Sequence, residues 1–139
     1  MKNRLLLNLL FCSLITYPSS CKKYIQHQEE NALINLVTNG TWRVSRYQDH
    51  QTDITASFTG YVFQFRSNGT VDGVIGAQTT AGTWSADVNA RTIQSDFPNA
   101  ADPLKKLNYT WKVTDSYSDS VSARTLVDSV YNFLELHKN

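Results

Sequence analysis

Histidine is the side chain best suited to proton transfer near neutral pH, and the chain contains three, His27, His50 and His137. General acid–base and nucleophilic catalysis both need such a group held beside a nucleophile or a second titratable group. None of the three stands at a spacing from such a partner that indicates a site, and the sequence has neither a glycine-rich phosphate loop nor a cysteine–histidine metal motif. We therefore expect a protein that is not an enzyme and that holds no cofactor.

Two carboxylates and an imidazole lie close together in the segment 49–53, which contains Asp49, His50 and Asp53. These side chains could bind a cation, but a stable metal site needs three or four converging ligands. The surrounding residues, 47–58, are mostly polar, which is typical of a solvated loop. We expect no metal site in this segment.

A set of large aromatic residues is the strongest candidate for a ligand-binding surface, because such rings line most small-molecule pockets. The candidates are Trp42, Tyr61, Phe63, Phe65, Trp84, Tyr109 and Trp111. Arg91 and Arg124 could orient a ligand beside them or could lie exposed. The same rings could instead fill a solid core, because strands of about seven residues, ~23 Å long, enclose a narrow interior.

The first twenty residues have the three regions of a secretory signal peptide. Lys2 and Arg4 lie at its start, an apolar run covers residues 5–16, and a short polar segment ends at Ser20. A bilayer-spanning helix takes about 20 apolar residues, and this run is shorter. We therefore expect residues 1–20 to be removed, which places Cys21 at the new N-terminus.

The segment 14–21 resembles the lipobox of bacterial lipoproteins, in which small residues precede a cysteine that becomes lipidated. Ser19 and Ser20 are the small residues, and Cys21 is the acceptor. The resemblance implies a membrane anchor on Cys21, followed by a tether over residues 21–30. Lys22 is not the aspartate of an inner-membrane retention signal, so we expect an outer-membrane lipoprotein. The alternative is ordinary secretion, with a free thiol at Cys21.

The charge balance gives no sign of a polyanionic partner. The chain of 139 residues has a formal net charge of +1, and loss of Lys2 and Arg4 leaves 11 basic residues against 12 acidic ones. A charge this small does not indicate nucleic-acid binding. The apolar fraction of 41% predicts one folded domain, residues 31–139, which we expect to be monomeric.

The period of the apolar residues indicates the secondary structure. Residues 31–37 place four apolar side chains on one helical face and predict a short helix. From Gly40 onward the period is two, which is typical of half-buried strands. The predicted strands cover residues 39–47, 61–66, 70–75, 82–86, 91–97, 107–114, 120–126 and 131–138.

Eight short strands at a spacing of about ten residues predict an all-β protein. They can close into an antiparallel up-and-down barrel, which removes the exposed edges that a sandwich would leave. The interior of an eight-stranded barrel is either filled by side chains or holds one small ligand. We predict such a barrel, preceded by a short N-terminal helix.

Short motifs recur in a definite order along residues 33–138. They are Gly40-Thr41-Trp42, Tyr61-Val62-Phe63-Gln64-Phe65, Asn68-Gly69-Thr70, Gly82-Thr83-Trp84, Leu107-Asn108, Trp111-Lys112-Val113 and Leu134-Glu135-Leu136. In this order they resemble the lipocalin-like lipoproteins of Gram-negative bacteria. The resemblance implies a barrel that commonly binds small hydrophobic molecules. It also implies that Trp42 packs at the closed end against a basic residue near the C-terminus, for which Lys138 is the candidate.

The leading functional hypothesis is therefore a membrane-anchored protein that binds or carries a small hydrophobic ligand in the cell envelope. The alternative is a solid barrel whose surface contacts an envelope protein or glycan. Two Asp-Ser-Val triplets, at 119–121 and 128–130, resemble an O-glycosylation motif of some Gram-negative bacteria. Ser120 and Ser129 are the candidate acceptors.

Overall fold

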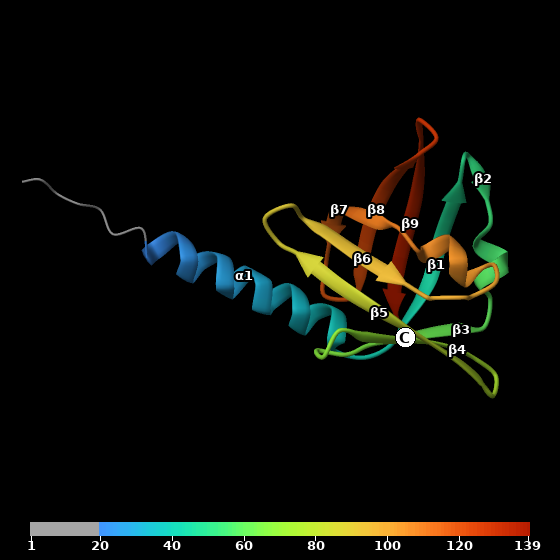
Figure 1. Cartoon of the computed structure of the whole chain (residues 1–139), viewed down its shortest axis with the longest axis horizontal. Helices are drawn as coiled ribbons and strands as arrows, with labels where there is room; N and C mark the ends of the chain where they lie inside the picture. Colours follow the sequence, from blue (N-terminus) through green and yellow to red (C-terminus); the bar gives the residue numbers. More distant parts are fainter. Residues whose placement is uncertain (1–19) are drawn as a thin grey trace, which may run out of the picture.

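Antiparallel strands wrap into a closed barrel in the computed structural model, which describes residues 20–139 (Figure 1). The wall consists of β1 (Trp42–Asp49), β3 (Tyr61–Phe65), β4 (Thr70–Ile75), β5 (Gln78–Asp87), β6 (Thr92–Asp96), β7 (Thr110–Ser116), β8 (Ser120–Val127) and β9 (Val130–Lys138). Each wall strand pairs with the next along the chain, and β1 closes the barrel on β9. The two-residue strand β2 (Thr52–Asp53) pairs with the end of β1. The predicted eight-stranded up-and-down barrel is confirmed.

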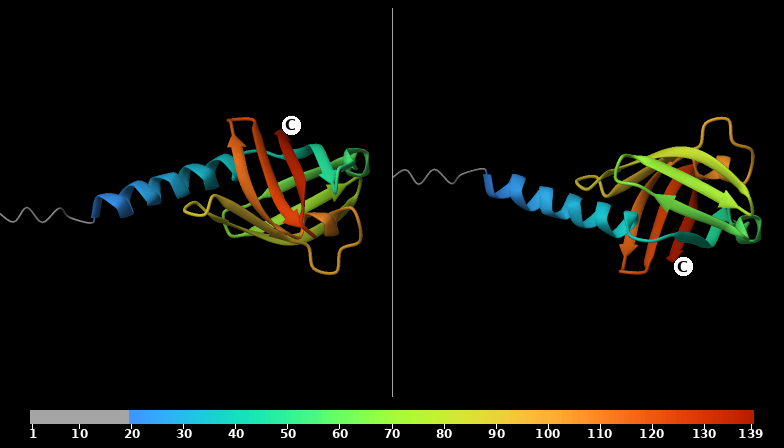
Figure 2. Two further views of the ribbon diagram at one scale, coloured as in Figure 1. Left: turned by 90° about the horizontal axis from the view of Figure 1, so that it is seen from above. Right: turned by 90° about the horizontal axis from the view of Figure 1, so that it is seen from below.

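The helix α1 (Ser20–Thr38) projects away from the barrel and meets it at its C-terminal end (Figures 1 and 2). It is longer than the predicted helix. Residues 22–30 are rich in lysine, glutamine and glutamate, which have high helix propensity but give no apolar period in the sequence. The backbone of the expected tether, 21–30, is thus helical, whereas residues 1–19 of the expected signal peptide lie outside the described residues. Within residues 20–139, no helix combines the length and apolar character needed to cross a membrane.

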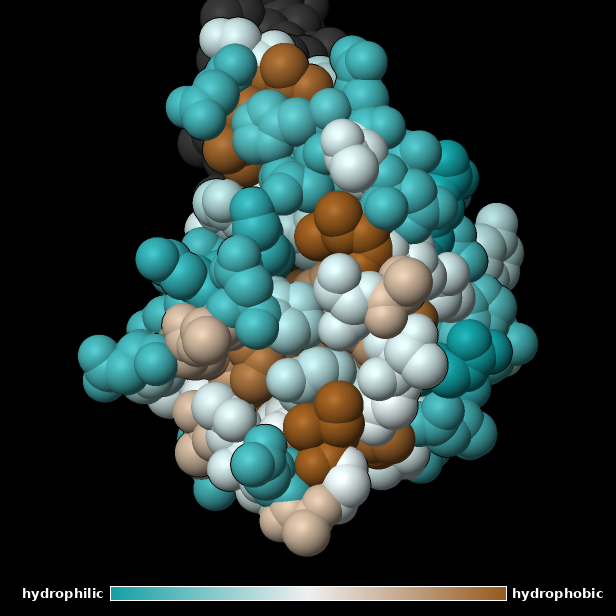
Figure 3. All heavy atoms as spheres, turned by 90° about the vertical axis from the view of Figure 1, so that its right-hand side faces the viewer, coloured by the Kyte–Doolittle hydropathy of each residue, from teal (hydrophilic) through white to brown (hydrophobic). Residues whose placement is uncertain are grey.

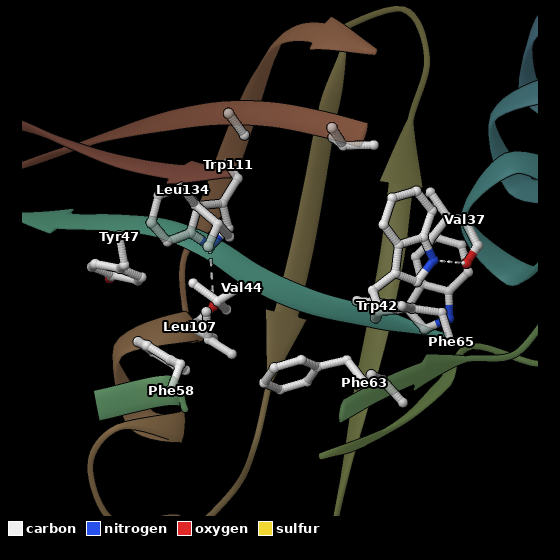
Figure 4. Close-up of a cluster of buried hydrophobic side chains, with 14 of the residues drawn as sticks. Val37, Trp42, Val44, Tyr47, Phe58, Phe63, Phe65, Leu107, Trp111 and Leu134 are labelled. Atoms are coloured by element: carbon white, nitrogen blue, oxygen red, sulfur yellow. Dashed lines mark hydrogen bonds between the residues drawn. The ribbon is translucent and has the colours of Figure 1, made fainter. Parts of the chain in front are cut away.

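Strand β1 buries three side chains whose spacing breaks strict alternation. Trp42, Val44 and Tyr47 all point into the barrel (Figure 4). The register against β9 shifts between Val44 and Arg46, so a bulge adds one residue and turns Tyr47 inward. Sequence periodicity cannot detect such a bulge, and for this reason the prediction ended the first strand at Tyr47 and began a polar loop there. The strand instead continues to Asp49.

The repeated Gly-Thr-Trp motif needs glycine for two different reasons. Gly40 has φ +92°, a left-handed conformation that disfavours other residues. Gly82 is required by crowding, since a Cβ there would lie 2.7 Å from the ring of Phe97 and 2.6 Å from the carbonyl of Asp96. Phe97 can therefore lie flat against β5, where it is almost completely buried.

Two 3-10 helices cover the end of the barrel away from α1: η1 (Thr55–Phe58) and η2 (Leu104–Leu107). The strands β1 and β3 share only the pair Trp42 and Phe63 and then diverge. The connection between them, which includes η1, covers the gap that this divergence leaves. Phe58 fills the resulting space and stacks on Tyr47 at 5.3 Å between ring centroids. The β6–β7 connection, which contains η2, lies beside η1 (Figure 1).

Both candidate glycosylation sites lie in the β8–β9 region. Ser129 is exposed in the two-residue turn between the strands, where Asp128 and Ser129 both have positive φ, as a type I′ hairpin turn requires. Ser120 begins β8 and is half-buried. Of the two, Ser129 is the more accessible to a modifying enzyme, and its modification stays a prediction.

Candidate functional site

An apolar cavity lies in the middle of the barrel and is the candidate binding site. Its volume is about 40 Å³. The lining residues come from β3, β6, β7, β8, β9 and the β6–β7 connection: Phe63, Phe65, Ile93, Ser95, Phe97, Leu107, Trp111, Val121, Ala123, Leu134 and Leu136. A cavity for one water needs roughly 10–15 Å³, whereas drug-sized ligands occupy pockets of about 300–1,000 Å³. The barrel is therefore nearly filled in this conformation.

The few polar groups in the cavity wall are already hydrogen-bonded. Ser95 Oγ donates to the carbonyl of Leu107 at 2.7 Å, and Trp111 Nε1 donates to the same oxygen at 3.2 Å. Among the described residues, no buried side-chain nitrogen or oxygen lacks a partner. The cavity therefore suits an uncharged hydrocarbon group, since a buried polar ligand atom would find no free partner there.

Three of the seven predicted ligand-binding residues, Phe63, Phe65 and Trp111, line the cavity. Tyr61 and Tyr109 lie behind them, with Tyr61 stacked on Phe63 at 6.0 Å and Tyr109 edge-on to Trp111 at 5.9 Å.

Trp84 and Trp42 pack elsewhere in the core. Trp84 lies edge-on to Phe65 at 5.5 Å and donates from Nε1 to the carbonyl of Arg66 at 2.8 Å. Trp42 closes the barrel at the α1 end, where its Nε1 donates to the carbonyl of Val37 at 2.8 Å (Figure 4). Lys138 Nζ lies 5.3 Å from the centroid of the Trp42 ring, as the lipocalin resemblance implied.

Sequence reasoning missed the aliphatic part of the cavity wall. Ile93 and Leu134 line the cavity, whereas every predicted ligand contact was aromatic. A period-two pattern also turns Val121 and Ala123 inward on β8. Arg91 is exposed, and Arg124 lies outside the barrel with its guanidinium 4.7 Å from the centroid of the Tyr131 ring, so neither contributes to the cavity.

A polar cluster around Asp49 lies at the η1–η2 end of the barrel. Its carboxylate accepts hydrogen bonds from Lys106 Nζ at 2.7 Å and Asn132 Nδ2 at 3.1 Å, and it lies 2.8 Å from His50 Nδ1. The bond to Lys106 lowers the pKa of the Asp49 carboxyl and raises the pKa of the Lys106 ammonium. Asn132 is fully buried and accepts from the backbone N–H of His50 at 2.9 Å. The cluster joins β1, β9 and the β6–β7 connection.

The cluster does not form the cation site that the segment 49–53 could have formed. Asp53 turns away from Asp49 and instead accepts a hydrogen bond from the backbone N–H of Thr55 at 2.8 Å. Lys106 occupies the position beside Asp49 that a cation would take. In the described part of the chain, no three histidine, cysteine or acidic side chains gather closely enough to hold a metal ion.

Tyr47 connects this polar cluster to the apolar interior. Its hydroxyl donates to the carbonyl of Lys106 at 2.5 Å, while its ring packs edge-on to Trp111 at 5.7 Å. Burial, together with the nearby Asp49 carboxylate, raises the pKa of the hydroxyl far above its usual value. Tyr47 is therefore a neutral hydrogen-bond donor at any physiological pH.

Comparisons with known proteins support the fold. No protein-family model matches the chain, and no curated protein matches its sequence. A crystal structure of a DUF4847 family protein from Bacteroides vulgatus is similar, with a TM-score of 0.56 and 15% identity over 77% of this chain and 97% of that one. Japanin from Rhipicephalus appendiculatus, in a structure bound to cholesterol, has a TM-score of 0.53 and 6% identity over 74% of this chain and 76% of Japanin. At these identities the likeness shows a lipocalin-like barrel and nothing finer.

Proposed function

We propose that this barrel binds a small apolar molecule, or the hydrocarbon part of a larger one, in its internal cavity. The observation that carries the proposal is an internal cavity whose wall is almost wholly apolar and whose two polar groups are already hydrogen-bonded. Such a wall binds by excluding hydrocarbon from water, at about 25 cal/mol per Å² of buried apolar surface. It offers no charge or free donor to recognise a polar substrate.

The size of the cavity narrows the ligand class. At about 40 Å³ it admits only a slender group without rearrangement, so anything larger must move side chains or a covering segment. A linear acyl chain suits this space better than a rigid ring system. The cholesterol bound to Japanin supports the general proposal, because a protein with a similar fold binds a lipid.

The second part of the proposal concerns location. We infer a lipid anchor at Cys21, on the strength of the signal-like residues 1–20 and the small residues before the cysteine. The helix α1 would then be a stalk between membrane and barrel, about 27 Å long at 1.5 Å per residue from Cys21 to Thr38. A barrel held near an outer membrane would have lipid tails within reach as ligands.

Native mass spectrometry tests ligand binding directly. The chain from residue 21 onward, with Cys21→Ser to prevent lipidation, is incubated with a total bacterial lipid extract and measured before and after denaturation. We expect a discrete added mass that is lost on denaturation, because the barrel holds its ligand only while folded. A bare protein mass at every lipid concentration would contradict ligand binding.

The two cysteines allow a matched test of the anchor. In a Gram-negative host supplied with a labelled fatty acid, Cys21→Ser is expected to abolish both labelling and recovery of the protein in the membrane fraction. Cys12→Ser is the control, since Cys12 lies inside the apolar run and would leave with the signal peptide. Equal labelling of both variants would rule out Cys21 as the lipidated residue.

One observation favours the alternative of a surface interaction module. Leu126, Tyr131 and Phe133, all in the β8–β9 hairpin, are 59%, 46% and 42% exposed. Leu126 and Tyr131 are directly paired across the hairpin, so they form one small apolar surface. The η1–η2 end seen in Figure 3 differs, with apolar side chains in small groups separated by polar ones. A barrel without ligand would make the hairpin surface the better candidate.

A further inference from the structure

The β6–β7 connection, residues 97–109, covers one end of the cavity and is called the strap below. Its helix η2 places Leu104 and Leu107 one 3-10 turn apart, and both are buried, at 3% and 5% exposure. Leu107 is part of the cavity wall. Leu104 lies over Gly73 of β4, so closely that a Cβ at residue 73 would be 3.1 Å from Leu104 Cδ2. Displacement of Leu107 would therefore remove part of the cavity wall.

The strap has few backbone connections to the barrel wall. Its own N–H groups bond within the strap: those of Lys105, Lys106, Asn108 and Tyr109 donate to the carbonyls of residues 101, 103, 105 and 107. The side chain of Asn108 pairs with both the N–H and the carbonyl of Phe97, at 2.7 and 3.2 Å, and so ties the two ends of the strap together. A segment with this pattern can move without breaking the sheet.

Side-chain bonds from three strands hold the strap in place. Ser95 Oγ of β6 and Trp111 Nε1 of β7 donate to the carbonyl of Leu107, and two further bonds join the strap to β1. Both bonds to β1 are made by Lys106. Its Nζ donates to Asp49 at 2.7 Å, and its carbonyl accepts from the Tyr47 hydroxyl at 2.5 Å. A surface cleft of about 330 Å³ runs beside this contact, lined by Ile54 and Ser57 from one covering segment and by Asp102, Pro103 and Lys106 from the strap. The Lys106 bonds lie beside this cleft and join the strap to β1.

We propose that the strap is a displaceable plug and that the apolar ligand enters and leaves beneath it. Displacement requires Lys106 to release Asp49 and Tyr47, and the carbonyl of Leu107 to release Ser95 and Trp111. This inference rests on the proposed function and specifies how that site is gated. A cavity of about 40 Å³ must enlarge to take a ligand, and withdrawal of Leu104 and Leu107 supplies the space next to it. The wall strands, which are paired all around the barrel, need not separate.

The test compares Lys106→Met with Lys105→Met in the chain from residue 21 onward carrying Cys21→Ser. Methionine is unbranched like lysine but one atom shorter, and it removes both the charge and the hydrogen-bond donor. Lys105 is exposed one residue away. Hydrogen exchange of the strap amides is measured together with stopped-flow uptake and release of N-phenyl-1-naphthylamine, an uncharged apolar fluorophore. Tyr47→Phe is a second variant that removes only the hydroxyl bond to Lys106.

For Lys106→Met we expect the strap amides to exchange about tenfold faster, as loss of a hydrogen bond to a charged group predicts. The association and dissociation rate constants of the fluorophore are expected to rise together by a similar factor. Tyr47→Phe should act in the same direction, and Lys105→Met should match the parent. Faster strap exchange with unchanged fluorophore rates would overturn the plug while leaving binding intact, and unchanged strap exchange would overturn the role of Lys106. Absence of saturable uptake in every protein, the parent included, would overturn the proposed function itself.

Discussion

Replacement of Trp42 by alanine is expected to lower the free energy of unfolding by about 3–5 kcal/mol, the usual cost of removing a fully buried tryptophan. Trp42 is 1% exposed and lies where α1, β1, β3 and β9 meet. Its partner Phe63 forms the only pair between β1 and β3 in the described chain, so this strand contact depends on its position. A domain of this size has about 5–15 kcal/mol of stability in total.

The variant loses three interactions at once. The indole fills the end of the barrel, its Nε1 satisfies the carbonyl of Val37 at the end of α1, and its ring receives the ammonium of Lys138. Trp42→Phe keeps an apolar ring and removes the hydrogen bond, so it should fall between the parent and the alanine variant. Loss of the indole is also expected to loosen the last turn of α1, because Val37 packs there.

Urea unfolding followed by circular dichroism measures this effect. The control is Tyr117→Ala, which also removes an aromatic ring, but one that is 65% exposed, and it should change stability by less than about 0.5 kcal/mol. If Trp42→Ala were as stable as the control, Trp42 would not be part of the barrel closure.

The strands of this barrel could be predicted because a half-buried strand alternates apolar and polar residues along the sequence. The bounds of β4, residues 70–75, were predicted as observed, since the Asn68-Gly69 turn fixes its start. Phe63, Phe65 and Trp111, which were predicted either to line a ligand site or to fill the core, are buried. Where no bulge interrupts a strand, period two establishes which face each residue occupies, and eight such strands have one economical closure.

Features that depend on distant partners could not be predicted. Asn132 shares the inward face of β9 with Leu134, yet it is buried without penalty only because Asp49 and the backbone of His50 meet it from β1. The bulge that turns Tyr47 inward is similarly decided by pairing with β9. In both cases the pairing partner lies on a strand that is far away in the sequence.

The binding site was only partly predictable for a related reason. Periodicity shows that a residue faces inward but not how deep it lies along the barrel axis. Trp42 and Trp111 both face inward, but Trp42 closes the α1 end while Trp111 lines the cavity. The predicted ligand contacts were all large aromatic residues. A cavity instead forms where small residues such as Ala123 leave space.

The cavity itself can be enlarged or filled at one point, because Ala123 of β8 and Leu134 of β9 are directly paired and both line it. Leu134→Ala removes a buried side chain and is expected to cost about 2–5 kcal/mol in unfolding free energy, with a larger cavity left behind. Ala123→Val adds two methyl groups to the same space. A β-branched residue suits a strand, so its stability should stay within about 1.5 kcal/mol of the parent.

We expect the less stable variant, Leu134→Ala, to gain ligand binding and the more stable one, Ala123→Val, to lose it. The enlarged apolar cavity of Leu134→Ala is expected to stay dry and to accept benzene, as engineered apolar cavities do. Benzene at a hundred times its dissociation constant would then restore about 2.7 kcal/mol of stability. The filled cavity of Ala123→Val should bind neither benzene nor lipid, although this protein is the more stable of the two.

Thermal unfolding with and without benzene, together with native mass spectrometry in lipid extract, distinguishes the possible outcomes. Leu126→Ala is the control, since Leu126 is on the same hairpin but 59% exposed, and it should leave both measurements unchanged. Lipid retained by Ala123→Val at the parental level would place the ligand outside this cavity. Loss of lipid in Ala123→Val, with benzene-dependent stabilisation of Leu134→Ala, would locate the binding site at the β8–β9 wall, because only the free volume beside residues 123 and 134 differs between these variants.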